Sequence, residues 1–223
     1  MEVSVVIPNY SHFRLVNELL VSIHKHSNPD QIIVVDDCSP DEKTAFGLAW
    51  WKEAYGVDIE TPMNNIGFLR NSNMGMGMAK GDVLVLISTD VIIETDFVKL
   101  IKDALSENSR RLVGGIVYNG STGWNQFGTK VFPYAEGWLL ACTKEAWKDL
   151  GGFDERFCPS DYEDVDLSTT AIEKGYELHS LNNPGLRHIG GQSIGYNEVR
   201  EEQTKKNQKK FEQKWIKEME NAK

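Results

Sequence analysis

Short apolar runs alternate with longer amphipathic segments through the first half of the chain. The apolar runs occupy residues 3–7, 32–35, 57–59, 83–87 and 112–117. Between them, apolar residues recur at helical spacing in two stripes, one of Leu15, Val16, Leu19, Leu20 and Ile23, the other of Phe97, Val98, Ile101 and Leu105. Strands that alternate with helices indicate an α/β fold with a doubly wound, mostly parallel central sheet, and we expect both stripes in its core.

The pattern changes after residue 117. Residues 118–138 are rich in glycine and aromatic residues, and short elements follow them. We expect this smaller, mixed region to elaborate the same sheet rather than to form a separate domain. From Tyr196 onward the chain is highly polar, with Phe211, Trp215 and Met219 at helical spacing, which predicts a C-terminal helix docked by a narrow apolar stripe.

The composition is that of an ordinary globular protein. Of the 223 residues, 40% are hydrophobic and 26% are charged, and no run approaches the roughly 20 apolar residues of a membrane helix. The segment MEVSVVIPNY enters a strand directly, without a signal-peptide pattern, so we expect a cytoplasmic location. Cys38, Cys142 and Cys158 are widely spaced, indicate neither a disulfide framework nor a zinc site, and are expected to be packing residues.

The net charge of −9 argues against nucleic acid as a partner, because binding to a polyanion requires a basic face. The charge is also uneven. Residues 197–223 carry eight basic and six acidic residues, a net of +2, so residues 1–196 carry −11. A phosphate-bearing ligand is therefore easier to hold with a divalent cation among the carboxylates.

Two adjacent aspartates, Asp36 and Asp37, follow a buried strand in VVDDCSPDE. Ser39 is expected to cap the next helix, with Glu42 closing a capping box, which leaves both aspartates without a capping role. They are either turn formers or ligand contacts. The ligand interpretation is favoured, because open α/β sheets bind ligands at the carboxyl ends of their strands.

The run DVLVLISTDV ends on Ser88, Thr89 and Asp90 rather than on a glycine or proline turn. The next helix has its own expected cap in Thr95, with Asp96 in its first turn, so Asp90 lies too early to cap it. Asp90 is either an Asx turn or a single hard oxygen ligand, of the kind that Mg²⁺ and Mn²⁺ take together with waters and phosphate oxygens.

The densest acidic cluster is SDYEDVDLSTTAIEKG, residues 160–175. Ser160 and Glu163 fit a capping box, an interpretation that leaves Asp164 and Asp166 unassigned. Adjacent helical positions point in different directions, so Asp164 can face a cleft as a general base while Leu167 faces the core.

Two further residues have both a structural and a functional interpretation. His188, in RHIGGQS, lies in a loop, where a lone histidine is more often structural, although imidazole also binds metals and phosphates. Trp138 opens a strand-like run and is either a core aromatic or a platform for a sugar ring. The segments GMGMAKG and GWNQFGTK lack the glycine spacing of a dinucleotide fingerprint and the residue order of a phosphate loop, which argues against NAD binding and ATPase activity.

The sequence resembles the family 2 glycosyltransferases of the GT-A fold in an ordered series of motifs: VSVVIPNY, IIVVDDCSPD, NNIGFLRNSNMGMGMAKGDVLVLISTD, GWLLACTKEAWKDLGGFDERF, EDVDLSTTAIEKGYEL and RHIGG. The resemblance runs from residue 3 to about residue 191. It implies a single GT-A-like catalytic domain over residues 1–195, with a nucleotide-binding half at 1–117 and an acceptor-side half at 118–195. The C-terminal helical extension, residues 196–223, lies outside it.

The resemblance also implies residue roles. Positions beside the nucleotide match Pro8, Tyr10, Asp37, Gly67 and Asn73, with Asp37 at the base. Asp90 matches the metal-binding acid of the D-x-D motif, although Ser88 stands where relatives often carry its first acid, so the metal site has one carboxylate.

On the other side of the expected reaction centre, Asp164 matches the base of inverting family members. His188 matches a histidine that in some members joins the metal or the diphosphate. Trp138 and Glu163 are expected beside the sugar or the acceptor.

Together these roles imply inverting transfer of a sugar from a nucleotide diphospho-sugar, with UDP- or dTDP-sugars expected first, to a hydroxyl of a glycan, a lipid-linked sugar or a protein. Mn²⁺ or Mg²⁺ is the implied cofactor. The alternative is a catalytically inactive sugar- or nucleotide-binding scaffold on the same fold. The basic C-terminal helix leaves open a peripheral membrane contact, a homodimer contact, or a helix that covers the domain.

Overall fold

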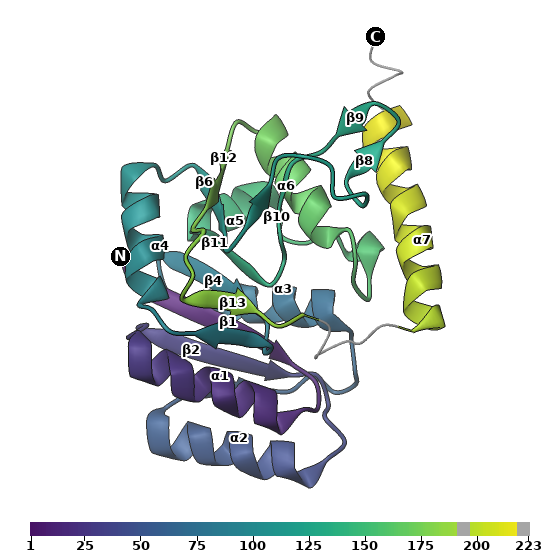
Figure 1. The fold of residues 1–223 in the computed structure, drawn as a ribbon. Coiled ribbons are helices and arrows are strands. Elements are labelled where there is room, and N and C mark those ends of the chain that lie inside the picture. Colours follow the sequence, from purple (N-terminus) through teal and green to yellow (C-terminus); the bar gives the residue numbers. More distant parts are fainter. Residues whose placement is uncertain (191–196, 218–223) are drawn as a thin grey trace.

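A seven-stranded sheet runs through the centre of the molecule (Figure 1). The structure, a computed structural model, describes residues 1–190 and 197–217. In spatial order the strands are β12 (Glu177–Ser180), β6 (Arg111–Gly114), β11 (Leu139–Thr143), β4 (Val83–Ile87), β1 (Val3–Asn9), β2 (Gln31–Asp36) and β3 (Asp58–Glu60). Neighbouring strands pair in parallel, except that β11 is antiparallel to both β4 and β6. The predicted mostly parallel α/β sheet is therefore confirmed.

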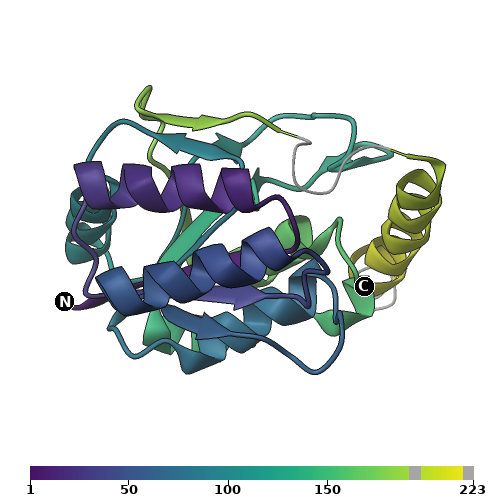
Figure 2. The same cartoon turned by 90° about the horizontal axis from the view of Figure 1, so that it is seen from below.

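Helices cover both faces of this sheet. One face carries α1 (Phe13–His26), α2 (Glu42–Tyr55) and α4 (Phe97–Glu107), and Figure 2 shows α1 and α2 side by side over it. The other face carries α3 (Phe68–Met78), α5 (Lys144–Leu150) and α6 (Glu163–Glu173). Strand side chains alternate between the two cores, so Val5 packs into the first and Val6 into the second. Both predicted helical stripes are buried, on α1 and α4.

The second half of the chain contributes β11 and β12 to the central sheet and helps to form three small two-stranded sheets. Their strands are β7 (Val117–Tyr118) with β10 (Tyr134–Ala135), β5 (Val91–Ile93) with β13 (Leu186–His188), and β8 (Gln126–Phe127) with β9 (Lys130–Val131).

The prediction of one continuous strand over residues 112–117 is wrong, because the chain leaves the central sheet between β6 and β7. The backbone of Gly115 lies so close to the Trp138 indole that a Cβ atom there would come within 2.0 Å of the ring. The N–H of Gly115 still donates to the Leu139 carbonyl at 3.2 Å, and the chain then turns to pair with β10.

Two helices begin at residues other than those predicted. Asp41 caps α2, because its carboxylate accepts from the Thr44 N–H at 2.9 Å, whereas the Ser39 hydroxyl donates to Asp36 at 2.5 Å. The hydroxyl of the expected Ser39 cap is thus used in a local hydrogen bond to the end of β2. Asp96 caps α4 by accepting from the Lys99 N–H at 3.1 Å, one residue beyond the expected Thr95.

The C-terminal helix α7 (Glu198–Glu212), which continues into the π-helical turn η2 (Gln213–Lys217), docks on the second half of the domain (Figure 1). Phe211 is 0% exposed and packs among Phe127, Phe132 and Tyr162, which confirms its place in the predicted stripe. Met219, expected on the same stripe, lies outside the described residues.

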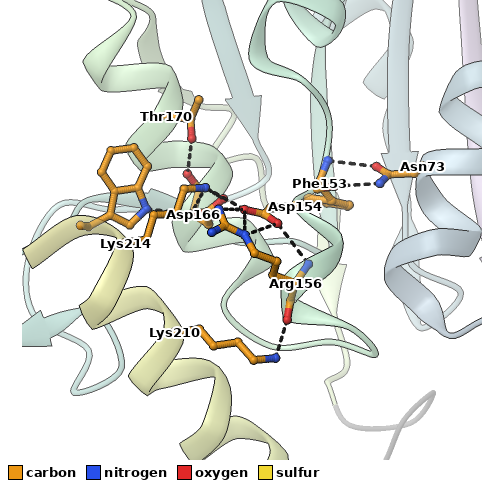
Figure 3. A network of polar contacts seen from close by, with 9 residues as sticks. Asn73, Phe153, Asp154, Arg156, Asp166, Thr170, Lys210 and Lys214 are labelled. Atoms are coloured by element: carbon orange, nitrogen blue, oxygen red, sulfur yellow. Dashed lines mark hydrogen bonds and ion pairs between the residues drawn. The ribbon is translucent and has the colours of Figure 1, made fainter. Parts of the chain in front are cut away.

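Polar contacts reinforce this docking (Figure 3). The Lys214 ammonium bridges Asp154, at 3.0 Å, and Asp166 on α6, at 2.8 Å. Burial raises the pKa of Asp166 even beside this cation. Burial also acts to raise the pKa of Asp154, but hydrogen bonds from Arg156 and Lys214 outweigh it, and the net pKa lies below its ordinary value.

None of the helices within residues 1–190 and 197–217 combines the length and apolar character needed to cross a bilayer.

Replacing Phe211 with alanine is expected to lower the free energy of unfolding by about 3–5 kcal/mol, because a buried aromatic side chain is lost and a cavity remains. Val199 lies on the same helix and is 79% exposed, so Val199→Ala is the matched control and is expected to change stability by less than about 0.5 kcal/mol. Urea denaturation measures both. Equal, small losses of unfolding free energy in the two variants would show that α7 does not dock as described.

Candidate active site

Two adjoining cavities open at the carboxyl ends of the parallel strands. The strand-end cavity has a volume of about 550 Å³ and is lined by residues that include Pro8, Tyr10, Asp37, Gly67 and Thr89. The acidic cavity has a volume of about 620 Å³, and seven of its lining residues are carboxylic acids: Asp90, Glu136, Asp161, Glu163, Asp164, Glu198 and Glu201. Phe68, Ser88 and Ser160 line both cavities, so the two form one continuous depression.

The two aspartates after β2 have different structural roles. Asp36 is buried and accepts from the Asn9 amide at 2.7 Å and from Ser39, so the turn-former interpretation describes it. Asp37 accepts from the N–H groups of Ile66, at 2.7 Å, and Gly67, at 2.8 Å. It thereby fixes the entry to α3 while lining the strand-end cavity.

Four of the five predicted nucleotide contacts meet in the strand-end cavity: Pro8, Tyr10, Asp37 and Gly67. Gly67 has a φ of 85°, a left-handed value that favours glycine. Asn73 is absent from the lining of either cavity described above. Its amide exchanges two hydrogen bonds with the backbone of Phe153, at 2.8 and 2.9 Å (Figure 3), so the structure does not bring it together with the other four, and its place beside the nucleotide stays a prediction.

Asp90 and His188 come together where β5 pairs with β13. The Ile189 N–H donates to the Asp90 carbonyl at 3.0 Å, and the Asp90 Oδ1 lies 3.3 Å from the His188 Nε2. A carboxylate oxygen and an imidazole nitrogen suit Mn²⁺ or Mg²⁺, with waters and phosphate oxygens completing the coordination. Within residues 1–190 and 197–217 no cluster of three or more such ligands occurs, and Asp90 and His188 supply two.

Glu136 joins this pair and was not among the predicted site residues. Its Oε2 accepts from the Trp138 indole N–H at 2.9 Å, and its Oε1 lies 4.0 Å from the His188 Nδ1. Trp138 is buried and its ring stacks on His188, with centroids 5.6 Å apart, so the core interpretation describes its packing. The one signal in the sequence was the position of Glu136 beside Gly137 and Trp138, ahead of a strand.

Helix α6 begins without the predicted capping box. Asp161 and Tyr162 both have φ values of 76°, and Tyr162 occupies the N-cap position without a side-chain hydrogen bond to the helix. The left-handed pair turns the chain so sharply that Ser160 and Glu163 do not form the reciprocal bonds of a capping box. Glu163 instead starts the helix as a buried residue of the acidic cavity.

Asp164 is held from two sides. Its Oδ2 accepts from the Gly137 N–H at 3.0 Å and its Oδ1 from the Val165 N–H at 2.8 Å. Gly137 permits this approach, since a Cβ atom there would lie 3.3 Å from the Asp164 Cβ. Burial raises the pKa of Asp164 to about 6, against the lowering effect of these two N–H donors, and the charge of Glu136 adds to the rise.

Glu163 is the second unusual acid. It is 7% exposed, and its Oε2 has no hydrogen-bond partner within the part of the chain that the structure describes. Burial raises the pKa of this carboxyl well above its ordinary value, and the neighbouring Asp164 charge raises it further. A buried polar atom without a protein partner, on a residue that lines a cavity, is suited to a polar group of a ligand.

The C-terminal helix completes the acidic cavity. Arg200 donates to both carboxylate oxygens of Asp161, at 2.7 and 3.2 Å, and the Thr204 hydroxyl donates to the same group at 2.6 Å. The buried Asn207 amide nitrogen lies 2.6 to 3.0 Å from the carbonyl oxygens of Phe157, Ser160 and Asp161. The segment expected to be an extension thus holds the loop that precedes Asp164.

Comparisons with known proteins identify relatives of this chain. A family model described as Glycosyl transferase family 2 matches residues 4–159. Glycosyltransferase GlyG of Streptococcus pneumoniae serotype 4 (strain ATCC BAA-334 / TIGR4) is 27% identical over 118 residues, which cover 52% of this chain and 39% of that protein. This chain therefore spans well under half the length of that curated relative.

Solved structures share the fold. The mannosyltransferase PcManGT from Pyrobaculum calidifontis, in complex with GDP-Man and Mn²⁺, superposes with a TM-score of 0.65 at 21% identity, covering 80% of this chain and 54% of that one. S. aureus TarS 1-349, in complex with UDP-GlcNAc, gives a TM-score of 0.64 at 19% identity, covering 88% and 62%. Both similarities show the GT-A fold.

The family match covers Asp90 and the lining of the strand-end cavity except Ser160, but it ends before Asp164 and His188, so the roles of those two residues depend on the geometry of the acidic cavity. The match over residues 4–159, the strand order of the central sheet and the acids at its strand ends all point to one family: this chain belongs to glycosyltransferase family 2.

Proposed function

We propose that this chain transfers a sugar from a nucleotide diphospho-sugar to an acceptor hydroxyl with inversion of the anomeric centre, and that Asp164 is the general base. The observation that carries the proposal is the state of Asp164. Its carboxylate is fixed by two backbone N–H groups, lines a cavity continuous with the strand-end cavity, and has a pKa raised to about 6. A base with a pKa near the working pH is the best compromise between being ionised and accepting a proton.

The strand-end cavity is the proposed donor site. Pro8, Tyr10 and Gly67 line it where a nucleotide would pack, and Asp37 lies at the proposed position of the base. A UDP- or dTDP-sugar is the expected donor. The complexes of PcManGT with GDP-Man and of TarS with UDP-GlcNAc contain different bases, so titration rather than the fold has to identify the nucleotide.

Asp90 and His188 would hold Mn²⁺ or Mg²⁺, which when bound supplies positive charge to the diphosphate leaving group. Glu136 lies 4.0 Å from the other ring nitrogen of His188 and orients that ring together with Trp138.

In the acidic cavity, Asp164 takes the proton from the acceptor hydroxyl as that oxygen attacks the anomeric carbon. Glu163 is proposed to contact a hydroxyl of the sugar or the acceptor through its unpartnered Oε2. An inactive scaffold is less favoured, because a scaffold has no need of an oriented carboxylate with a raised pKa. The acceptor is proposed to be a glycan, a lipid-linked sugar or a protein.

Removing the base is the first test. Asp164→Asn is expected to lower donor turnover, with water or an added acceptor, by about 10²- to 10⁴-fold while leaving nucleotide diphosphate binding intact. Asp103→Asn, on the exposed surface of α4, is the control and should retain activity. Turnover by Asp164→Asn equal to that of the control would contradict the assignment.

The same base gives the activity a pH dependence. Because Asp164 acts only when ionised and its pKa is raised to about 6, kcat/KM should rise with pH through 6 and level off above 7. At pH 5 the ionised fraction, and with it kcat/KM, should be about tenfold below the plateau. A profile that is flat from pH 5 to 8 would oppose the proposal.

The donor site and its metal are tested by calorimetric titration with UDP, dTDP and GDP, each with and without Mn²⁺. One diphosphate is expected to bind at least about tenfold more tightly with the metal, because its phosphates complete the coordination. Asp90→Ala should lose this metal-dependent gain in affinity, and the control Asp103→Ala should keep it. If no diphosphate binds in either condition, the nucleotide-sugar function is refuted.

A further inference from the structure

An exposed tryptophan stands in the wall of the acidic cavity. Trp124 lines this cavity and is 56% exposed. The other aromatic residues in the described lining, Phe68, Tyr134, Trp138 and Tyr162, are buried or half-buried. Trp138, for which a sugar platform was one interpretation, has one ring face covered by His188 and Gly115 close to the edge of its indole. An accessible aromatic ring in this cavity is therefore supplied by Trp124.

The loop that carries Trp124 is fixed by the next residue. Asn125 is 0% exposed, and its amide nitrogen donates to the carbonyl oxygens of Gly120, at 3.0 Å, and Phe132, at 2.9 Å. Its amide oxygen accepts from the N–H and the hydroxyl of Thr122, at 2.8 and 3.1 Å. An exposed indole on a loop held by a buried amide binds a ligand without the entropic cost of ordering the loop.

Trp124 is also tied to the elements that hold the proposed base. The Tyr162 hydroxyl donates to the Trp124 carbonyl at 3.0 Å, and Tyr162 lies two residues before Asp164. Phe127 of β8 stacks on Phe211 of α7, with ring centroids 5.2 Å apart, and Figure 1 shows β8 and β9 beside this helix. The loop that carries Trp124 and the residues that precede Asp164 are consequently bonded to each other in the wall of the cavity.

The charge of the cavity limits what can lie against this indole. Seven lining residues are aspartate or glutamate, against two basic ones, His188 and Arg200. Arg200 is already bonded to Asp161 through two of its nitrogens. Away from Asp90 and His188, where a bound cation would meet the diphosphate, a negatively charged ring substituent would be repelled, whereas hydroxyl and ammonium groups find acceptors.

We propose that Trp124 is the acceptor platform of this enzyme, on which the apolar C–H face of an uncharged or amino sugar ring stacks while a hydroxyl of that ring is presented to Asp164. The inference rests on the proposed function of the same cavity. An indole offers a large flat apolar surface and attracts a cationic amino group, and both properties match this class of ring. Uronic acids and phosphorylated sugars are disfavoured by the surrounding carboxylates.

Saturation-transfer NMR tests the platform with simple glycosides as probes: methyl β-glucoside, methyl β-galactoside, methyl α-mannoside, methyl β-glucosaminide and methyl β-glucuronide. We expect the full chain to bind at least one neutral or amino glycoside through its C–H protons and to bind the glucuronide more weakly. Trp124→Ala should weaken the binding roughly tenfold, the order of effect of losing one stacked aromatic ring, and Trp124→Phe should restore most of it.

The matched control is Trp50→Ala. Trp50 is 53% exposed on α2 and lines neither of the two cavities, so its loss should leave glycoside binding unchanged. Equal affinity of Trp124→Ala and wild type, tighter binding of the glucuronide than of the uncharged glycosides, or no binding of any probe by wild type would each overturn the proposal.

Calorimetric titration of the same variants with UDP, dTDP and GDP separates this proposal from the proposed function. If wild type and Trp124→Ala bind the same nucleotide equally but glycoside binding does not depend on Trp124, the platform assignment alone fails. If wild type binds no nucleotide diphosphate, the donor site fails, whatever the glycosides do.

Discussion

The active site depends on the hydrogen bonds between the buried Asn207 amide and the carbonyl oxygens of Phe157, Ser160 and Asp161. These bonds hold two consecutive residues, Asp161 and Tyr162, in the left-handed region, where a residue other than glycine costs on the order of 1–3 kcal/mol. The turn is what buries Glu163 at the head of α6 and lets the Asp164 carboxylate meet the Gly137 N–H.

The site buries acidic side chains without a matching number of basic side chains. Asp166 and Asp154, farther along the same region, share the Lys214 ammonium, whereas Asp164 is offered only backbone N–H groups by the hydrogen bonds described and Glu163 keeps an unpartnered oxygen. The pKa of both Glu163 and Asp164 is consequently raised, mainly by desolvation. The fold thus pairs the buried Asp166 carboxylate with a cation. It leaves Asp164 and Glu163 available for proton exchange or ligand contact.

Much of the fold was predictable because the spacing of apolar residues is a local property of the sequence and indicates which face of a helix or strand is buried. The stripes of α1 and α4 and the buried strands follow directly from apolar spacing, and the acids at strand ends marked the cavity edge. The misassigned cap arose because a neighbouring carboxylate competes for the hydroxyl, since Ser39 bonds Asp36, three positions earlier, instead of capping α2. Asn73 lies away from the cavities because its amide is bonded to Phe153, which is 80 positions away in the sequence.

The acidic cavity was the least predictable part. Arg200, Thr204 and Asn207 lie on a helix whose polar sequence resembles a solvated surface, and local pattern cannot show that these residues bond a loop about 40 to 50 positions earlier. The sequence also did not indicate which tryptophan side chain is exposed. Trp124 and Trp138 both follow a glycine in the sequence, yet packing buries the indole of Trp138 and leaves that of Trp124 exposed.

The proposed function depends on a single displacement in which Asp164 activates the attacking oxygen on the face opposite the leaving diphosphate. Time-resolved ¹H NMR of an α-linked nucleotide sugar that the enzyme turns over, with water or a hydroxyl acceptor, reads out the configuration of the first product before it equilibrates. Inversion predicts that the β-anomer appears first. Initial formation of the α-anomer would mean retention, and would contradict both the single displacement and the role of Asp164 as its base.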